Sequence, residues 1–133
     1  MKILLIDSDS TERRKWAGGL EAYSAEYEVV KAHNGRLGLD LNMSRQFDCV
    51  ILELNLPDRT GLSVLLNLVE RPQHPRIPVV VLTNFVLYAL YPLAIRNGAR
   101  SCLEKDHTSI EQLDQAIRKA IAAVGPNKNR NPS

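Results

Sequence analysis

Residues 50–61, VILELNLPDRTG, have the pattern of a buried strand that runs into a loop. Apolar side chains surround one acid, Glu53, and Pro57 and Gly61 then end any regular structure. An ionised carboxylate is costly to bury unless another group pairs with it. The position of Glu53 at the end of a core strand therefore predicts a partner for its charge, and it directs attention to the other strand ends.

Five short apolar runs recur along the chain, and they are mostly continuous, as expected for strands buried on both faces. They occupy residues 2–6, 27–32, 48–54, 77–83 and 101–104. Helical patterns alternate with them at residues 10–24, 35–44, 62–70, 86–97 and 109–124. Expected N-caps are Ser10 or Thr11 for the first helix and Thr108 or Ser109 for the last. Pro92 falls inside the fourth helix and should kink or shorten it.

This alternation of strand and helix predicts an α/β domain, in which a parallel five-stranded sheet is covered by helices on both sides. Right-handed crossovers then connect successive strands into a small doubly wound domain. We expect that domain to span residues 1–124. Residues 125–133 form a polar tail that we expect to be mobile.

Polar side chains collect where the predicted strands end, which is where ligands bind in such sheets. They are Asp7, Ser8 and Asp9 after the first strand, Glu53 after the third, Thr83 and Asn84 after the fourth, and Glu104, Lys105 and Asp106 after the fifth. Converging carboxylates favour Mg²⁺, and a hydroxyl and an ammonium suit phosphoryl oxygens. The set therefore predicts a phosphoryl-transfer pocket.

From residue 2 to about residue 123, the chain resembles the receiver domain of two-component response regulators. The matching landmarks are ILLIDSD, AHNGRLGL, DCVILELNLPDRTG, VVVLTN, AIRNGARSCLEK and the final amphipathic helix, all in order. The resemblance implies a flavodoxin-like (βα)₅ fold. It also implies that the carboxylate after the third strand accepts a phosphoryl group from a histidine kinase while nearby acids hold Mg²⁺.

The resemblance assigns roles by position. It places the phosphoacceptor at Glu53, the acidic pair at Asp7 and Ser8, with Asp9 beside them, the sensing hydroxyl at Thr83, the lysine at Lys105 and a metal-binding backbone carbonyl at Asn55. The implied metal ligands are thus Asp7, Glu53 and Asn55. We expect Mg²⁺ binding to be weak or absent, because four positions depart from the family pattern.

Glu53 stands where the family has Asp, and the additional methylene moves the carboxylate by about 1.5 Å. A misplacement of about 1 Å can cost on the order of 100-fold in rate. Ser8 replaces the second acid, and Asp9 cannot substitute for it because alternate side chains point in opposite directions. Cys102 stands in place of an aromatic residue, and Asp106 in place of the proline that follows the lysine.

These departures together favour an atypical receiver, a pseudo-receiver that is a signalling module and not an enzyme. In one interpretation, a Glu53–Lys105 pair places negative charge where the phosphoryl group would sit and fixes the domain in one state. In a second, Glu53 only neutralises Lys105. The alternative function is a Mg²⁺-dependent receiver that is phosphorylated on Glu53 or a nearby acid such as Asp58. A flavin or nucleotide binder is disfavoured because no glycine-rich loop follows the first strand.

Residues 84–95, NFVLYALYPLAI, are unusually apolar for a helix with one face in water. Large exposed apolar patches mark protein contacts, and Tyr is common in binding hot spots. The predicted partner face consists of Phe85, Leu87, Tyr88, Tyr91 and Cys102. Expected partners are a histidine kinase or another signalling protein, or a second copy bound through the fourth helix, fifth strand and fifth helix. Alternatively, Pro92 reshapes the segment so that more of it packs inside.

The bulk composition narrows the partner classes further. Seventeen basic and fifteen acidic residues give a net charge of +2, which does not indicate nucleic acid binding. No apolar stretch approaches the roughly 18–20 residues of a membrane span. Both cysteines, Cys49 and Cys102, lie among apolar residues, as free thiols of a reducing compartment do, so we expect a cytoplasmic protein.

Overall fold

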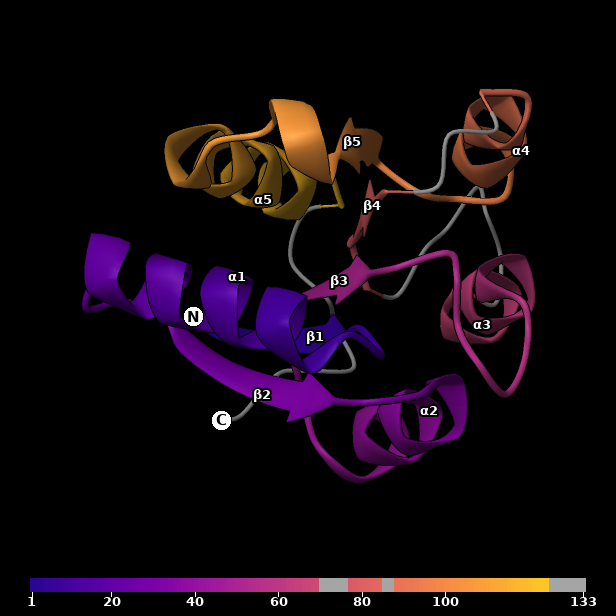
Figure 1. The fold of residues 1–133 in the computed structure, drawn as a ribbon, viewed down its shortest axis with the longest axis horizontal. Coiled ribbons are helices and arrows are strands. Elements are labelled where there is room, and N and C mark those ends of the chain that lie inside the picture. The colour runs from indigo at the N-terminus through magenta and orange to yellow at the C-terminus, as the bar shows by residue number, and fades with distance from the viewer. Residues whose placement is uncertain (70–76, 85–87, 125–133) are drawn as a thin grey trace.

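The computed structural model describes residues 1–69, 77–84 and 88–124. It contains one five-stranded parallel sheet with the strand order β2-β1-β3-β4-β5. The strands are β1 (Lys2–Ile6), β2 (Glu28–Ala32), β3 (Cys49–Leu52), β4 (Val79–Thr83) and β5 (Ser101–Glu104). A helix follows each strand along the chain, which confirms the predicted flavodoxin-like (βα)₅ fold (Figure 1).

Two layers of helices cover the sheet (Figure 1). The helices are α1 (Ser10–Tyr23), α2 (Gly35–Ser44), α3 (Gly61–Leu68), α4 (Leu90–Arg96) and α5 (Ile110–Val124). Alternate strand residues point to opposite faces, so Ile3 and Leu5 pack in the core cluster with α1 and α5, whereas Leu4 and Ile6 pack in the cluster with α3 and α4. Because both faces are buried, the strands read as continuous apolar runs in the sequence.

The helix caps differ in part from the sequence prediction. Asp9, and not Ser10 or Thr11, caps α1, since its carboxylate accepts hydrogen bonds from the amides of Thr11 (2.9 Å) and Glu12 (3.1 Å). For α5 the predicted cap is present. The Ser109 hydroxyl accepts from the Gln112 amide at 3.1 Å, and the Gln112 side chain accepts from the Ser109 amide at 2.8 Å, which is a capping box.

The fourth helix is shorter than predicted. It begins at Leu90 and not at residue 86, so Pro92 lies in its first turn. A proline is tolerated there because the first-turn amides have no partner within the helix. The shortening expected from Pro92 is therefore confirmed. Residues 85–87 and the tail 125–133 lie outside the described residues, and within the described part no helix is long and apolar enough to span a membrane.

Candidate functional site

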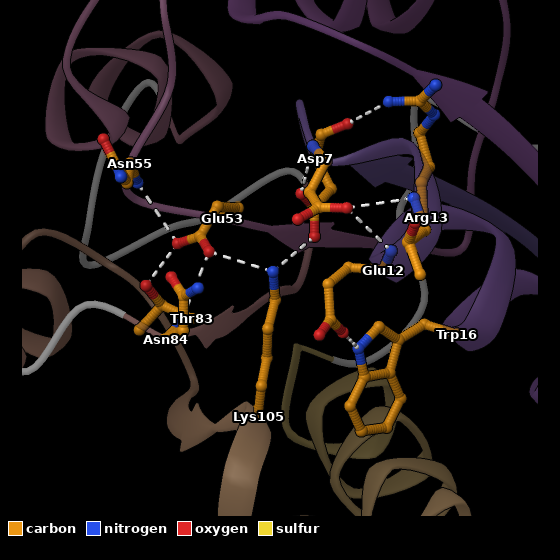
Figure 2. A network of polar contacts seen from close by, with 11 residues as sticks. Asp7, Glu12, Arg13, Trp16, Glu53, Asn55, Thr83, Asn84 and Lys105 are labelled. Carbon is orange, nitrogen blue, oxygen red and sulfur yellow. Dashed lines mark hydrogen bonds and ion pairs between the residues drawn. The ribbon is translucent and has the colours of Figure 1, made fainter.

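Four polar residues meet at the carboxyl edge of the sheet (Figure 2). Asp7 follows β1, Glu53 follows β3, Thr83 ends β4, and Lys105 begins a short 3₁₀ turn (Lys105–His107) after β5. Because β1 pairs with β3 and β3 with β4, their carboxyl ends lie side by side. The four side chains are almost fully enclosed, with relative exposures of 1% for Asp7, 3% for Glu53, 0% for Thr83 and 4% for Lys105.

Lys105 lies between the two acids. Its Nζ is 2.7 Å from Oδ2 of Asp7 and 3.0 Å from Oε1 of Glu53. Burial alone would lower the pKa of Lys105, but its hydrogen bond to Asp7 and the charge of Glu53 outweigh burial and raise that pKa. Burial raises the pKa of Asp7, against the opposing effect of its hydrogen bond to Lys105. The lysine therefore remains an ammonium ion at neutral pH and supplies the positive charge that the two acids require.

The Glu53 carboxylate accepts hydrogen bonds on both oxygens. Its Oε2 accepts from the Thr83 hydroxyl and from the backbone amide of Asn55 at 3.1 Å. Its Oε1 binds Lys105 and also faces the amide of Asn84 at 3.4 Å (Figure 2). A buried acid at the end of an apolar strand is thus satisfied by one ammonium, one hydroxyl and two backbone amides, each from a different position in the chain.

Asp7 is held equally firmly. Its Oδ1 accepts a hydrogen bond from the Asp9 amide at 3.0 Å, and its Oδ2 binds Lys105. In addition, Arg13 Nη1 donates to the backbone carbonyl of Asp7 at 2.7 Å, which brings a second cation to the edge of the pocket (Figure 2). All four carboxylate oxygens of Asp7 and Glu53 therefore already contact hydrogen-bond donors of the protein.

Other predicted site residues lie outside this network. Ser8 is exposed. Asp9 contributes its backbone amide, whereas its carboxylate caps α1 and does not enter the acidic pocket. Asn55 likewise contributes its amide and is exposed. The acidic cluster predicted at the first strand end is thus reduced to the single buried carboxylate of Asp7.

The residues of the predicted partner face are only partly described. Tyr88 is 63% exposed, and its ring meets that of Tyr91 edge-on at a centroid distance of 5.7 Å. Cys102 is half-buried, and its Sγ lies 3.9 Å from the Tyr91 carbonyl oxygen. Phe85 and Leu87 lie outside the described residues. The described part of the face therefore combines an exposed tyrosine, Tyr88, and a half-buried one, Tyr91, with the edge strand β5.

As arranged here, the two carboxylates that could bind magnesium already have a cation beside them. Mg²⁺ takes oxygen ligands in near-octahedral geometry, usually one or two carboxylates together with several waters. The candidate carboxylates, Asp7 and Glu53, are both bound to the Lys105 ammonium, and the position of the second acid is the neutral Ser8. In the described part of the chain, no group of three His, Cys, Asp or Glu side chains could hold a metal ion.

The sequence prediction missed a contact beside the site. The Asp58 carboxylate accepts hydrogen bonds from the amides of Gly35 and Arg36, each at 2.9 Å, and so ties the β3–α3 loop to the start of α2. Although its slight burial opposes the change, these bonds lower the pKa of Asp58. A signal did exist, because the Asn34-Gly35 turn begins a helix whose first amides require acceptors.

The fold and the site together define a class of protein, namely a doubly wound signalling domain with an acid, hydroxyl and lysine network at the carboxyl edge of its sheet. The family model of the response regulator receiver domain matches residues 3–118, and the chain belongs to that family. The predicted family is therefore confirmed. Receiver domains are the signalling modules of two-component systems, where they interact with histidine kinases and signalling partners.

Individual relatives support this membership. The transcriptional regulatory protein SrrA of Staphylococcus aureus is 33% identical over 82 residues, which cover 62% of this chain and 32% of SrrA. A receiver domain protein from Clostridium thermocellum is 28% identical, with a TM-score of 0.81 over 92% of this chain and 94% of that chain. The chain thus matches about a third of the length of SrrA. It matches nearly all of the solved receiver domain from Clostridium thermocellum.

A third similar structure holds a modified acid. A response regulator from Burkholderia pseudomallei, 27% identical with a TM-score of 0.77 over 92% of this chain and 69% of that chain, contains a phosphorylated aspartic acid, a calcium ion and citrate. The position that the family resemblance assigns to the phosphoacceptor is Glu53 in the present chain. The two proteins thus share a fold.

Proposed function

We propose that this chain is a pseudo-receiver that Glu53 holds in one activated-like state, and that it signals by protein contact without phosphotransfer. One observation carries the proposal. The Glu53 carboxylate binds both Thr83 and Lys105, the two residues to which the family resemblance assigns the sensing of a phosphoryl group. An anion attached to the chain itself thus makes the contacts that a transferred phosphoryl group would make.

The length and charge of the side chain support this proposal. A glutamate carboxylate extends about 1.5 Å further than that of an aspartate, which lets it reach the Thr83 hydroxyl and the Lys105 ammonium together. Neutralising Lys105 requires only an ion pair. The contacts to the Thr83 hydroxyl and to the amides of Asn55 and Asn84 go beyond neutralisation and favour a fixed conformation of the pocket.

The alternative function, a Mg²⁺-dependent receiver phosphorylated on an acid, is less well supported. A nucleophilic carboxylate needs an oxygen that is free to attack, and both oxygens of Glu53 accept hydrogen bonds. Phosphoryl transfer also depends on a metal to neutralise developing charge, and the two candidate carboxylates, Asp7 and Glu53, are both paired with the Lys105 ammonium. Asp58, the other acid considered, accepts hydrogen bonds from two amides of α2.

Protein contact then carries the output of the domain, which we take to span residues 1–124. The partner is a histidine kinase or another signalling protein, or a second copy, bound at the face formed by α4, β5 and α5. Two exposed apolar side chains that lie seven residues apart, Tyr88 before α4 and Ile95 on it, support such a contact, with exposures of 63% and 47%. The nearly balanced charge gives no support to a nucleic acid partner.

The test is the intact mass of the protein after incubation with acetyl phosphate and Mg²⁺. We expect no phosphoryl adduct on the wild type or on the Glu53→Gln control. We expect one on the Ser8→Asp/Glu53→Asp variant, which restores both acids of the family pattern. A phosphoryl adduct on the wild type that Glu53→Gln abolishes would show a working acceptor and overturn the proposal.

A further inference from the structure

A pocket of about 380 Å³ lies between β5 and the outer side of α5. Its lining includes Arg100 and Ser101 at the start of β5, and Gln112, Gln115 and Lys119 on α5, together with three alanines of the same helix. Arg100 directly precedes β5, so this end of the pocket lies at the amino end of the strands, whereas Glu53 follows the carboxyl end of β3. The pocket is thus distinct from the site of Glu53.

The floor of this pocket contains a polar group without a partner. Ser101 lies on the same face of β5 as Leu103, and Leu103 packs in the core cluster that contains Leu113 and Ile117 of α5. The Ser101 side chain is therefore directed toward α5. Among the described residues, its hydroxyl is the one buried side-chain nitrogen or oxygen atom without a hydrogen bond. Buried polar groups nearly always have a partner from the protein, a ligand or ordered water, so this hydroxyl can still form a hydrogen bond with a group from outside the described residues.

The rim of the pocket is positively charged and has no acid of its own. Neither Arg100 nor Lys119 has an ion pair with any residue that the structure describes, and both are exposed. By contrast, the neighbouring Arg118 is paired with Asp114 at 2.9 Å and with Glu26 at 3.4 Å. Two cations without an ion pair beside a hydroxyl favour a ligand that carries carboxylate groups.

We propose that this pocket binds an extended acidic segment of a partner protein, with a carboxylate side chain between Arg100, Lys119 and Ser101. The lining residues of α5 extend from Gln112 to Ala123, a distance of about 16 Å at 1.5 Å per residue. An extended segment of about five residues has this length. A single small anion would contact only part of the pocket. The alanine methyl groups leave room for the backbone of the segment. This inference rests on the proposed function, because it places a protein partner on β5 and α5, two elements of the face proposed above.

The test is a titration of the ¹⁵N-labelled protein with a short end-blocked peptide of alternating alanine and glutamate, followed by NMR. We expect saturable shifts at residues 100–101 and along α5, and none with the glutamine counterpart of the peptide. Arg100→Glu/Lys119→Glu should weaken binding by on the order of tenfold or more. The matched control is Lys31→Glu on β2, an exposed lysine at the opposite edge of the sheet, which should leave the affinity unchanged.

Ser101→Ala separates binding from folding. Removal of a buried hydroxyl without a partner should leave the stability of the free protein unchanged or increase it, while the affinity for the peptide falls. The proposal would be overturned if Lys31→Glu lost as much affinity as the Arg100→Glu/Lys119→Glu variant. It would also be overturned if the glutamine peptide or free glutarate gave an equal response, or if the glutamate peptide caused no shifts. None of these results depends on whether Glu53 accepts a phosphoryl group, so failure of this inference and failure of the proposed function are distinguishable.

Discussion

Two of the three buried carboxylates in the described part of the chain, Glu53 and Asp114, have the same kinds of partner and very different surroundings. Glu53 binds the Thr83 hydroxyl and the Lys105 ammonium, and Asp114 on α5 binds the Tyr27 hydroxyl at 2.5 Å and the Arg118 guanidinium at 2.9 Å. The cation beside Glu53 has a side-chain exposure of 2%, whereas the cation beside Asp114 has one of 42%. The chemistry of an ion pair therefore does not by itself identify a functional site.

Position and enclosure explain the difference. Glu53 lies at the carboxyl end of a central strand, where ligands bind in doubly wound sheets, and its cation is shared with a second buried acid, Asp7. Asp114 joins a helix to Tyr27, which directly precedes β2, and its cation extends into solvent beside Glu26. We therefore interpret the Asp114 contacts as a structural connection between α5 and the sheet. The Glu53 contacts form a pocket, and we infer that the balance between its two carboxylates and the Lys105 ammonium determines the conformation of that pocket.

The largest expected effect comes from removing each cation. Lys105→Met leaves Asp7 and Glu53 buried without a counter-charge, and breaking a buried pair in this way costs about 3–5 kcal/mol of unfolding free energy. Arg118→Met removes a solvent-exposed cation and should cost much less, because the Tyr27 hydroxyl still binds Asp114. Urea unfolding followed by circular dichroism measures both values.

A second property of Lys105→Met sharpens the same comparison. Its stability should recover toward acidic pH, since the unpaired carboxylates then take up protons, and the added Glu53→Gln substitution should recover part of the loss at neutral pH. Equal costs for the Lys105 and Arg118 variants would mean that the enclosure of the pocket has no energetic consequence. That result would remove the basis for treating the two networks differently.

An intermediate effect is expected at alkaline pH. The pKa of Lys105 is raised above its usual 10.5, and burial together with the hydrogen bond to Asp114 raises the pKa of Tyr27 above its usual 10.0. A raised folded-state pKa gives stability that is complete below the unfolded-state pKa and is lost as pH rises through the folded-state value. Each such group then contributes about 1.4 kcal/mol per pH unit to the decline.

Tyr27→Phe measures how much of the loss of stability at alkaline pH comes from the Asp114 network. It should cost about 1 kcal/mol at neutral pH and should make the decline above pH 10 less steep by about one proton. The part that remains belongs to Lys105, to Tyr91, whose pKa burial also raises, and to the thiols of Cys49 and Cys102, whose pKa values burial raises to about 12 and about 11. Urea unfolding at a series of pH values checks the slopes, and identical slopes for wild type and Tyr27→Phe would contradict the assignment.

The two networks also differ in how far the sequence predicted them. Glu53 interrupts an apolar run, and the rule for strand ends then places it near Asp7, Thr83 and Lys105. The contact between Tyr27 and Asp114 joins residues far apart in the chain, and an acid on a helix is too ordinary to predict a burial site. The same limit applies to Asp58, a loop residue whose partners lie at the start of α2, far away in the chain.

Local details were less predictable than the order of the elements. Asp9, Ser10 and Thr11 are all good N-cap residues, so the sequence alone could not decide which of them caps α1. The fourth helix starts at Leu90, which places Pro92 in the first turn, where a proline is tolerated. The position of Pro92 in the sequence indicated a shorter helix but did not define the first residue of that helix. The fold was therefore predictable from periodicity, whereas caps and long-range polar contacts required the structure.

The smallest expected effect concerns Mg²⁺. Because Lys105 supplies the positive charge between Asp7 and Glu53, we expect the thermal midpoint of the wild type to be the same in millimolar Mg²⁺ and in EDTA. Ser8→Asp/Glu53→Asp adds an acid and shortens the side chain that reaches Lys105. A metal at about 100 times its Kd would then stabilise this variant by about 2.7 kcal/mol. If the thermal midpoint of the wild type depended on Mg²⁺ and Asp7→Asn abolished this dependence, Lys105 would not exclude the metal. The Glu53 network would then differ from the Asp114 network in burial alone.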